Sequence, residues 1–198
     1  MRLLVQRIAL LLSGSSLLLS ISVQAAPHFV QCYDFGCKTT RELRFEPRQW
    51  EQIRAIFADG NVDIGAEKQA IRRAVAMMEV FSGELTDTHY DKGGNYPGSD
   101  IPGQMDCIDE STNTYQYLSA LQDLDLLKWH RVGLKQRRIV WFVTHWTATI
   151  REIHSNQRFA VDSWYRDNGE LPYIQPIDDW LSKRDFPDDF NPELAANR

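Results

Sequence analysis

The sequence predicts an α+β fold in a single domain, with helices in the first half of the chain and an antiparallel sheet in the second. Apolar residues recur at helical spacing through much of 47–122, whereas 129–164 is rich in Val, Ile, Trp, Phe and Thr. No connection in the second region is long enough for a crossover helix, so its strands should pair antiparallel. The 198 residues show no internal repeat, and their number suits one hydrophobic core.

Composition narrows the classes of function. Charged residues make up 25% of the chain and hydrophobic residues 43%, which is the balance of a folded globular protein. The formal net charge is -5. An acidic balance gives no support for nucleic-acid binding, which needs a clustered basic face. We therefore expect no nucleic-acid partner.

Residues 1–25 have the pattern of a signal peptide. Two arginines accompany a short apolar segment at residues 8–21, and small or β-branched residues occupy the -3 and -1 positions at Val23 and Ala25. The alternative is a membrane anchor, but a short segment with a Gly/Ser break does not span a bilayer comfortably. We expect a periplasmic or secreted protein whose mature domain is 26–198, with no stable membrane span after cleavage.

The cysteines fit an exported protein, because an oxidising compartment pairs accessible thiols. Cys32 and Cys37 are close in sequence, and Gly36 eases the tight loop between them, so we predict a disulfide worth about 2 kcal/mol. Cys107 is then left as a free thiol. Two alternatives stay open: Cys107 pairs with one of the other two, or Cys32 and Cys37 form half of a zinc site.

The elements before residue 84 are predicted as follows. Residues 26–45 should be extended, with an edge strand at 42–45, and a helix should follow over 47–58. A second helix is predicted over 66–82, with Gly83 at its C-terminal end. The apolar stripe of this second helix, which includes Met77, Met78 and Phe81, is interpreted as core.

Residues 84–106 are predicted to form a long loop, because Gly, Pro and Asn interrupt any regular pattern. Such a loop in a compact domain is usually functional or disordered. Here it is either a surface loop or a wall of the cleft that leads to Cys107. Asp87, Asp91 and Asn95 are possible calcium ligands, although their spacing is not that of a known calcium loop.

A third helix should begin at Cys107, with Asp106 as its N-cap, and continue to about Gln122. A hairpin turn is predicted at 155–157, and one helical turn around Trp180. The predicted strands are 129–134, 138–143, 145–153 and 158–164.

Three residues in this arrangement could catalyse an acyl transfer. Cys107 lies at a helix N-terminus, where the helix dipole lowers the pKa of a thiol. His145 could take the thiol proton, and Asp162 on the next strand could fix the tautomer of the imidazole. Gln104 is the nearest side-chain amide and the candidate donor to an oxyanion. The acidic residues around Cys107 oppose a thiolate.

The order and spacing of these residues resemble the transglutaminase-like superfamily of papain-like thiol enzymes. In that family a cysteine opens a helix, a histidine lies in a His-Ala-Trp strand motif and an aspartate follows in Val-Asp-Pro. The corresponding stretches here are His145-Trp146-Thr147 and Val161-Asp162-Ser163. The resemblance covers about 60 residues of the mature chain.

The resemblance implies a nucleophile helix packed on an antiparallel sheet, and chemistry at an amide or isopeptide bond of a protein or peptide in the cell envelope. We expect a monomeric cysteine hydrolase of protease or amidase type with no obligatory cofactor. The alternative is a catalytically inactive transglutaminase-like binding module, in which Trp146 or Trp164 fills the cleft. A third possibility is a structural exported domain in which Cys107 is bridged.

Overall fold

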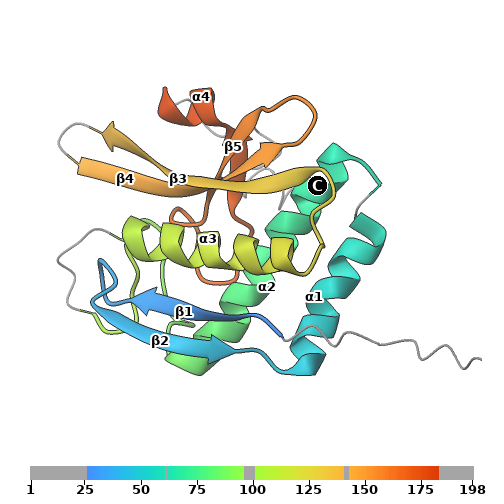
Figure 1. The fold of residues 1–198 in the computed structure, drawn as a ribbon. Coiled ribbons are helices and arrows are strands. Elements are labelled where there is room, and N and C mark those ends of the chain that lie inside the picture. The colour runs from blue at the N-terminus through green and yellow to red at the C-terminus, as the bar shows by residue number, and fades with distance from the viewer. Residues whose placement is uncertain (1–25, 61, 96–100, 141–142, 183–198) are drawn as a thin grey trace, which may run out of the picture.

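The computed structural model describes residues 26–60, 62–95, 101–140 and 143–182, which form a mixed α+β fold (Figure 1). The long helix α3 lies between a two-stranded and a four-stranded antiparallel sheet. In chain order the elements are β1 (His28–Tyr33), β2 (Thr39–Arg44), α1 (Pro47–Gly60), α2 (Ile64–Thr86), α3 (Cys107–Asp123), β3 (His130–Val140), β4 (Val143–Glu152), β5 (Arg158–Asp162), β6 (Tyr173–Pro176) and α4 (Ile177–Leu181).

The N-terminal hairpin is tied to α3 by one buried amide. Asn113 accepts the backbone N–H of Cys32 at 2.8 Å and donates to the carbonyl of Cys32 at 2.9 Å. Cys32 and Cys37 form a disulfide across the turn between β1 and β2, and Cys107 is a free thiol. The predicted edge strand at 42–45 overlaps β2, whereas β1 had been predicted only as extended chain.

Helix α2 is longer than the sequence predicts. It runs to Thr86, so Gly83 lies inside the helix and the prediction that it ends there is wrong. Asp87 ends the helix with a left-handed φ of 62°. Gly83 serves close packing instead, because a Cβ at this position would lie 3.0 Å from the main chain of His89. The chain after α2 can therefore fold back against the helix.

The larger sheet has the strand order β3-β4-β5-β6, and all neighbours are antiparallel as predicted. The predicted strand at 129–134 and residues 138–140 of the strand predicted at 138–143 belong to one long strand, β3, with a register shift between Gly133 and Gln136. Val143 already begins β4, and residues 141–142 lie outside the described residues. Strand β6 was not predicted. It pairs with β5 and brings the short helix α4 over one face of the sheet.

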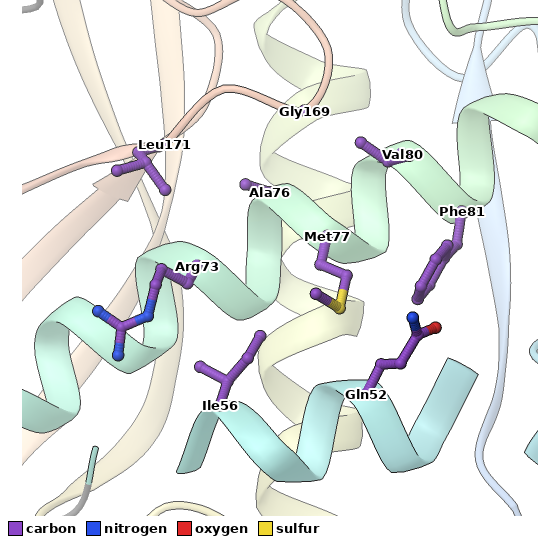
Figure 2. Close-up of a pocket in the computed structure, with 9 residues that line it drawn as sticks. All are labelled: Gln52, Ile56, Arg73, Ala76, Met77, Val80, Phe81, Gly169 and Leu171. Carbon is purple, nitrogen blue, oxygen red and sulfur yellow. The ribbon is translucent and has the colours of Figure 1, made fainter. Parts of the chain in front are cut away.

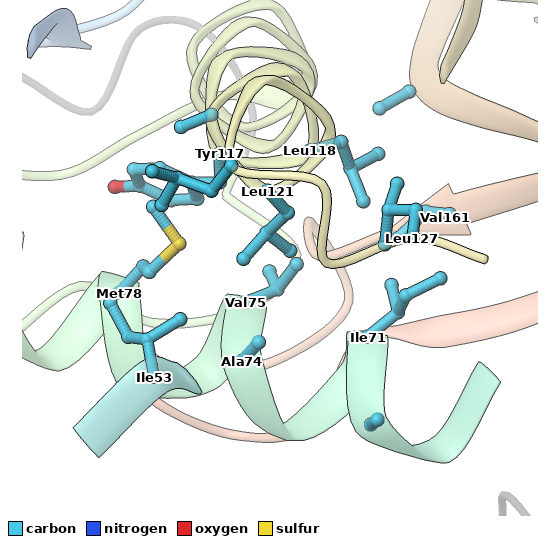
Figure 3. Packing of buried hydrophobic residues seen from close by; sticks show 14 of the residues in the cluster. Ile53, Ile71, Ala74, Val75, Met78, Tyr117, Leu118, Leu121, Leu127 and Val161 are labelled. Atoms are coloured by element: carbon cyan, nitrogen blue, oxygen red, sulfur yellow. The ribbon is translucent and has the colours of Figure 1, made fainter. Parts of the chain in front are cut away.

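The main hydrophobic core lies between α2, α3 and the inner face of this sheet (Figure 3). Ile71, Val75 and Met78 of α2 are fully buried, as are Leu118 and Leu121 of α3. Full burial of such side chains stabilises the fold by about 1.5–3 kcal/mol each. This packing fixes the direction of α3 and hence the position of the residue at its N-terminus.

The interpretation of the α2 stripe as core holds for Met78 and only in part for its neighbours. Met77 and Phe81 are partly buried against the core, and they line a pocket of about 460 Å³ together with Gln52 and Ile56 of α1 (Figure 2). The described part of the chain contains no helix of the length and apolar character needed to cross a bilayer. The predicted signal peptide at 1–25 lies outside the described residues.

Candidate functional site

Cys107 is the first residue of α3, and the local sequence fixes it there. Asp106 accepts the N–H groups of Ile108 at 2.9 Å and of Asp109 at 3.1 Å, while Asp109 accepts the N–H of Asp106 at 3.2 Å. This reciprocal capping box satisfies the free N–H groups of the first turn. The capping box therefore fixes the backbone position from which the Cys107 thiol projects.

The thiol of Cys107 lies against the main chain on both sides of His145. It donates to the carbonyl of Thr144 at 3.6 Å, and the sulfur accepts the backbone N–H of Trp146. Burial raises the pKa of the Cys107 thiol above its ordinary value; the Trp146 N–H opposes this rise, and the carboxylates of Asp106 and Asp162 add to it. The resting sulfur is therefore favoured as a neutral thiol, in contrast to the lowered pKa expected at a helix N-terminus.

His145 and Asp162 are paired across the sheet. The imidazole Nε2 lies 2.8 Å from Oδ2 of Asp162, and both side chains are buried. If Nε2 carries the proton that the carboxylate accepts, Nδ1 of the neutral ring is a free base. Nδ1 is buried and has no hydrogen-bond partner in the described part of the chain.

Aromatic rings surround the imidazole of His145. The ring centroids of Trp164, Tyr165 and Trp180 lie 4.7, 5.3 and 5.5 Å from the centroid of the imidazole. Trp180 also donates its indole N–H to Oδ2 of Asp162 at 2.7 Å. The rings exclude water from the His145–Asp162 pair, which strengthens its hydrogen bond.

Arg138 holds two of these rings in place. It is the cross-strand partner of His145, it donates to the Tyr165 hydroxyl at 2.8 Å, and it also donates to the carbonyl of Trp180. Sequence reasoning missed both Arg138 and Trp180 as members of this site. The alternating pattern of β3 and β4 carries a weak signal for Arg138, but the position of Trp180 depends on the unpredicted strand β6.

Gln104, the predicted oxyanion donor, is engaged elsewhere. Its amide donates to the carbonyl of Tyr90 at 2.9 Å and accepts from Lys92 at 3.1 Å and from Asn95 at 2.5 Å. These bonds direct the side chain into the loop that follows α2. The backbone N–H groups of Cys107 and Trp146 are the donors that face the sulfur.

The end of the loop predicted at 84–106, either a surface loop or a cleft wall, is anchored to the N-terminal hairpin beside the site. Asp34 accepts the N–H of Gly103 at 2.8 Å, and the N–H of Asp34 donates to the carbonyl of Gln104 at 3.0 Å. Asp109 accepts the N–H groups of Phe35 at 2.9 Å and Cys37 at 2.5 Å. The disulfide turn thus contacts both the segment that enters α3 and the first turn of α3.

Three buried carboxyl groups lie behind the segment that leads into α3. Glu79, Asp91 and Glu110 are each no more than 4% exposed. Burial is the main cause that raises the pKa of Glu79 to about 8, that of Asp91 to about 7 and that of Glu110 well above its ordinary value. Glu110 and Asp91 share a side-chain hydrogen bond, and Glu79 accepts the N–H of Gly169 at 3.1 Å.

Within the described residues, the two cysteines with metal-ligand spacing are already bonded to each other. Among the described residues, the one cluster with metal-ligand spacing is Cys32, Cys37 and Asp109, and its two sulfur atoms are joined in the disulfide. Of the three predicted calcium ligands, Asp87, Asp91 and Asn95, the last two hydrogen-bond to each other at 3.3 Å, and Asn95 does so through its amide donor and not through the oxygen that calcium requires.

The comparisons with known proteins give no further guidance. No family model, no curated protein and no solved structure matches this chain.

Proposed function

We propose that the protein is an exported cysteine hydrolase of transglutaminase-like type, which cleaves an amide or isopeptide bond in a protein or peptide of the cell envelope. The observation that carries the proposal is the imidazole of His145: Asp162 occupies Nε2, Nδ1 is unpaired, and the Cys107 thiol contacts the main chain on either side. The Cys32–Cys37 disulfide supports an extracytoplasmic location, and it leaves Cys107 as a free thiol.

The proposed chemistry begins with proton transfer. Nδ1 of His145 takes the proton of the Cys107 thiol as the sulfur attacks the substrate carbonyl carbon. The carbonyl π electrons move to oxygen, where the N–H groups of Cys107 and Trp146 can stabilise the negative charge. The imidazolium, held by Asp162, returns the proton to the leaving amine as the carbon–nitrogen bond breaks. Water then hydrolyses the thioester with His145 again acting as the base.

The raised pKa of the Cys107 thiol favours this general-base route over a preformed thiolate–imidazolium pair. A buried neutral thiol attacks poorly until a base removes its proton. The three aromatic rings around His145 hold the imidazole in one orientation and exclude water from it.

Two measurements test the proposal: labelling of Cys107 followed by mass spectrometry, and hydrolytic activity. Iodoacetamide should modify Cys107 in the native protein, and prior labelling should abolish amine or peptide release from casein and from glutaminyl peptides. Cys107→Ala and His145→Asn should lose this release, while the exposed substitution His154→Asn should retain it. Full activity of Cys107→Ala would overturn the proposal.

A second candidate function, that of an inactive binding module, is favoured by one observation. Cys107 is only 9% exposed and His145 only 4%, so both side chains are largely covered by the rest of the protein. A module of this kind would bind envelope peptides and leave them uncleaved. Peptide binding that is retained in Cys107→Ala, with no turnover by the unmodified protein, would identify it.

A further inference from the structure

A second pocket lies between the C-terminal half of α3 and strands β3 and β4. Its volume is about 420 Å³, and its lining includes Ser119 and Gln122 of α3, Arg131 of β3 and Arg151 of β4. Ser119 follows Cys107 by twelve residues in the helix, which corresponds to about 18 Å at 1.5 Å per residue. The pocket is therefore separate from the candidate catalytic site.

Like charges face each other on the strands that border this pocket. Arg131 lies directly opposite Arg151 in the β3–β4 register, and Arg151 lies directly opposite Arg158 in the β4–β5 register. Like charges in directly opposite positions destabilise a sheet. Three neighbouring arginines on adjacent strands are unexpected in a chain whose formal net charge is -5.

None of the three arginines has an acidic partner in the part of the chain that the structure describes. Arg131 donates to the carbonyls of Leu127 and His130, both at 3.1 Å, and Arg158 donates to the amide oxygen of Gln136 at 3.0 Å. These partners are neutral, and the Arg151 side chain makes no hydrogen bond or ion pair with the residues that the structure describes. The positive charge beside the pocket is thus uncompensated.

The pocket lining also offers a third donor and no competing acid. Gln122 accepts the N–H of Val132 through Oε1 at 2.9 Å, which leaves its Nε2 group without a partner among the described residues. The lining contains no Asp or Glu. Two guanidinium groups and one amide therefore border a space from which negative charge is absent.

We propose that this pocket binds a dianionic oxoanion of the phosphate type, with Arg131 and Arg151 as its main ligands and the amide of Gln122 as a further donor. Guanidinium groups match the oxygens of phosphate with paired, charge-assisted hydrogen bonds. A dianion between the two arginines removes their repulsion. The oxoanion is either free phosphate or the phosphate group of a larger molecule.

Titration of the purified protein with inorganic phosphate, followed by backbone amide NMR at constant ionic strength, tests the proposal. The amides of Gln122 and Val132 should shift saturably, and Arg151→Gln should weaken binding about tenfold or more. The exposed substitution Arg54→Gln on α1 should leave the affinity unchanged. Glycerol 3-phosphate distinguishes the sources: tighter binding than phosphate indicates an esterified group, and weaker binding indicates the free ion.

Three results would overturn the proposal: shifts that do not saturate, equal affinity in Arg151→Gln, or equally tight binding of acetate. Stability provides a second measurement. Without phosphate, Arg151→Gln should melt at the same or a higher temperature than the unmodified protein, because a repulsive charge is removed. A lower melting temperature would assign Arg151 a structural role and would count against the proposal. Arg151→Lys keeps the charge and loses the paired N–H donors of the guanidinium group, so it should bind phosphate with intermediate affinity.

Discussion

The indole N–H of Trp180 lies 2.7 Å from Oδ2 of Asp162, the same oxygen that lies 2.8 Å from the imidazole of His145. Two donors on one carboxylate oxygen fix the orientation of the carboxylate, and the carboxylate fixes the ring. The base of the proposed triad is thus oriented by a residue from the last described helix, 18 positions after Asp162 in the chain.

Removal of this indole donor should impair catalysis more than folding. Trp180→Phe keeps an aromatic ring but loses a hydrogen bond to a charged group, which is worth about 1.5–3 kcal/mol. We expect kcat/KM, or the labelling rate of Cys107, to fall roughly tenfold to a hundredfold. Trp50→Phe is the matched control, because the buried Nε1 of Trp50 has no partner in the described chain. Equal losses of activity in both variants would contradict the positioning role.

The labelling rate of Cys107 should continue to rise with pH above the pH at which an exposed cysteine has reached its full rate. Burial raises the pKa of this thiol, so its reactive anion forms at a higher pH than that of an exposed cysteine, whose pKa is about 8.5. The rate of iodoacetamide modification from pH 6 to 10 provides the measurement. A plateau below pH 7 would instead indicate a thiolate–imidazolium pair.

Much of the fold follows from sequence patterns, because helices and antiparallel strands depend on local periodicity. The helix start at Cys107 was predicted from the Asp106 cap, and the capping box is present. Strand β6 was missed because Pro172 precedes it and Pro176 is its last residue, and proline usually indicates a loop. Its strand conformation comes from pairing with β5, which is a tertiary effect.

The candidate site was predictable only where one residue could be placed against another by strand register. His145 and Asp162 are brought together as their predicted neighbouring strands imply. Gln104 was chosen for its proximity in sequence, and the loop uses its amide instead. Arg138 and Trp180 were missed because their roles depend on how α4 packs over the sheet.

Stability should decrease as the pH rises from about 4 to 8, the reverse of the usual acid denaturation. Unfolded Glu and Asp lose their protons near pH 4, whereas the folded state holds them until the pH reaches about 8 at Glu79 and about 7 at Asp91. Folding takes up protons in this window. The stabilisation from these groups is therefore fully present below about pH 4 and decreases as the pH rises to about 8. Urea midpoints at pH 5 and pH 8 provide the measurement.

Glu79→Gln should flatten this pH dependence by on the order of a few kcal/mol, because the amide can still accept the N–H of Gly169 and carries no charge. The exposed substitution Glu84→Gln, on the same helix, should leave it unchanged. Asp91, Glu110 and Glu170 also face this region, so part of the slope should remain in the variant. An unaltered slope in Glu79→Gln would show that other groups cause it.

Reduction of the Cys32–Cys37 disulfide should loosen the entrance to α3. Asp109 holds the turn through the N–H groups of Phe35 and Cys37, and Asp34 holds Gly103, so a more mobile turn disturbs the segment that leads to Cys107. Cys32→Ser/Cys37→Ser should lose about 2 kcal/mol of stability. Hydrogen exchange should also become faster at residues 103–109, with α1 as the internal reference. Unchanged protection of 103–109 in this variant would show that the hydrogen bonds of Asp34 and Asp109 hold the turn without the covalent link.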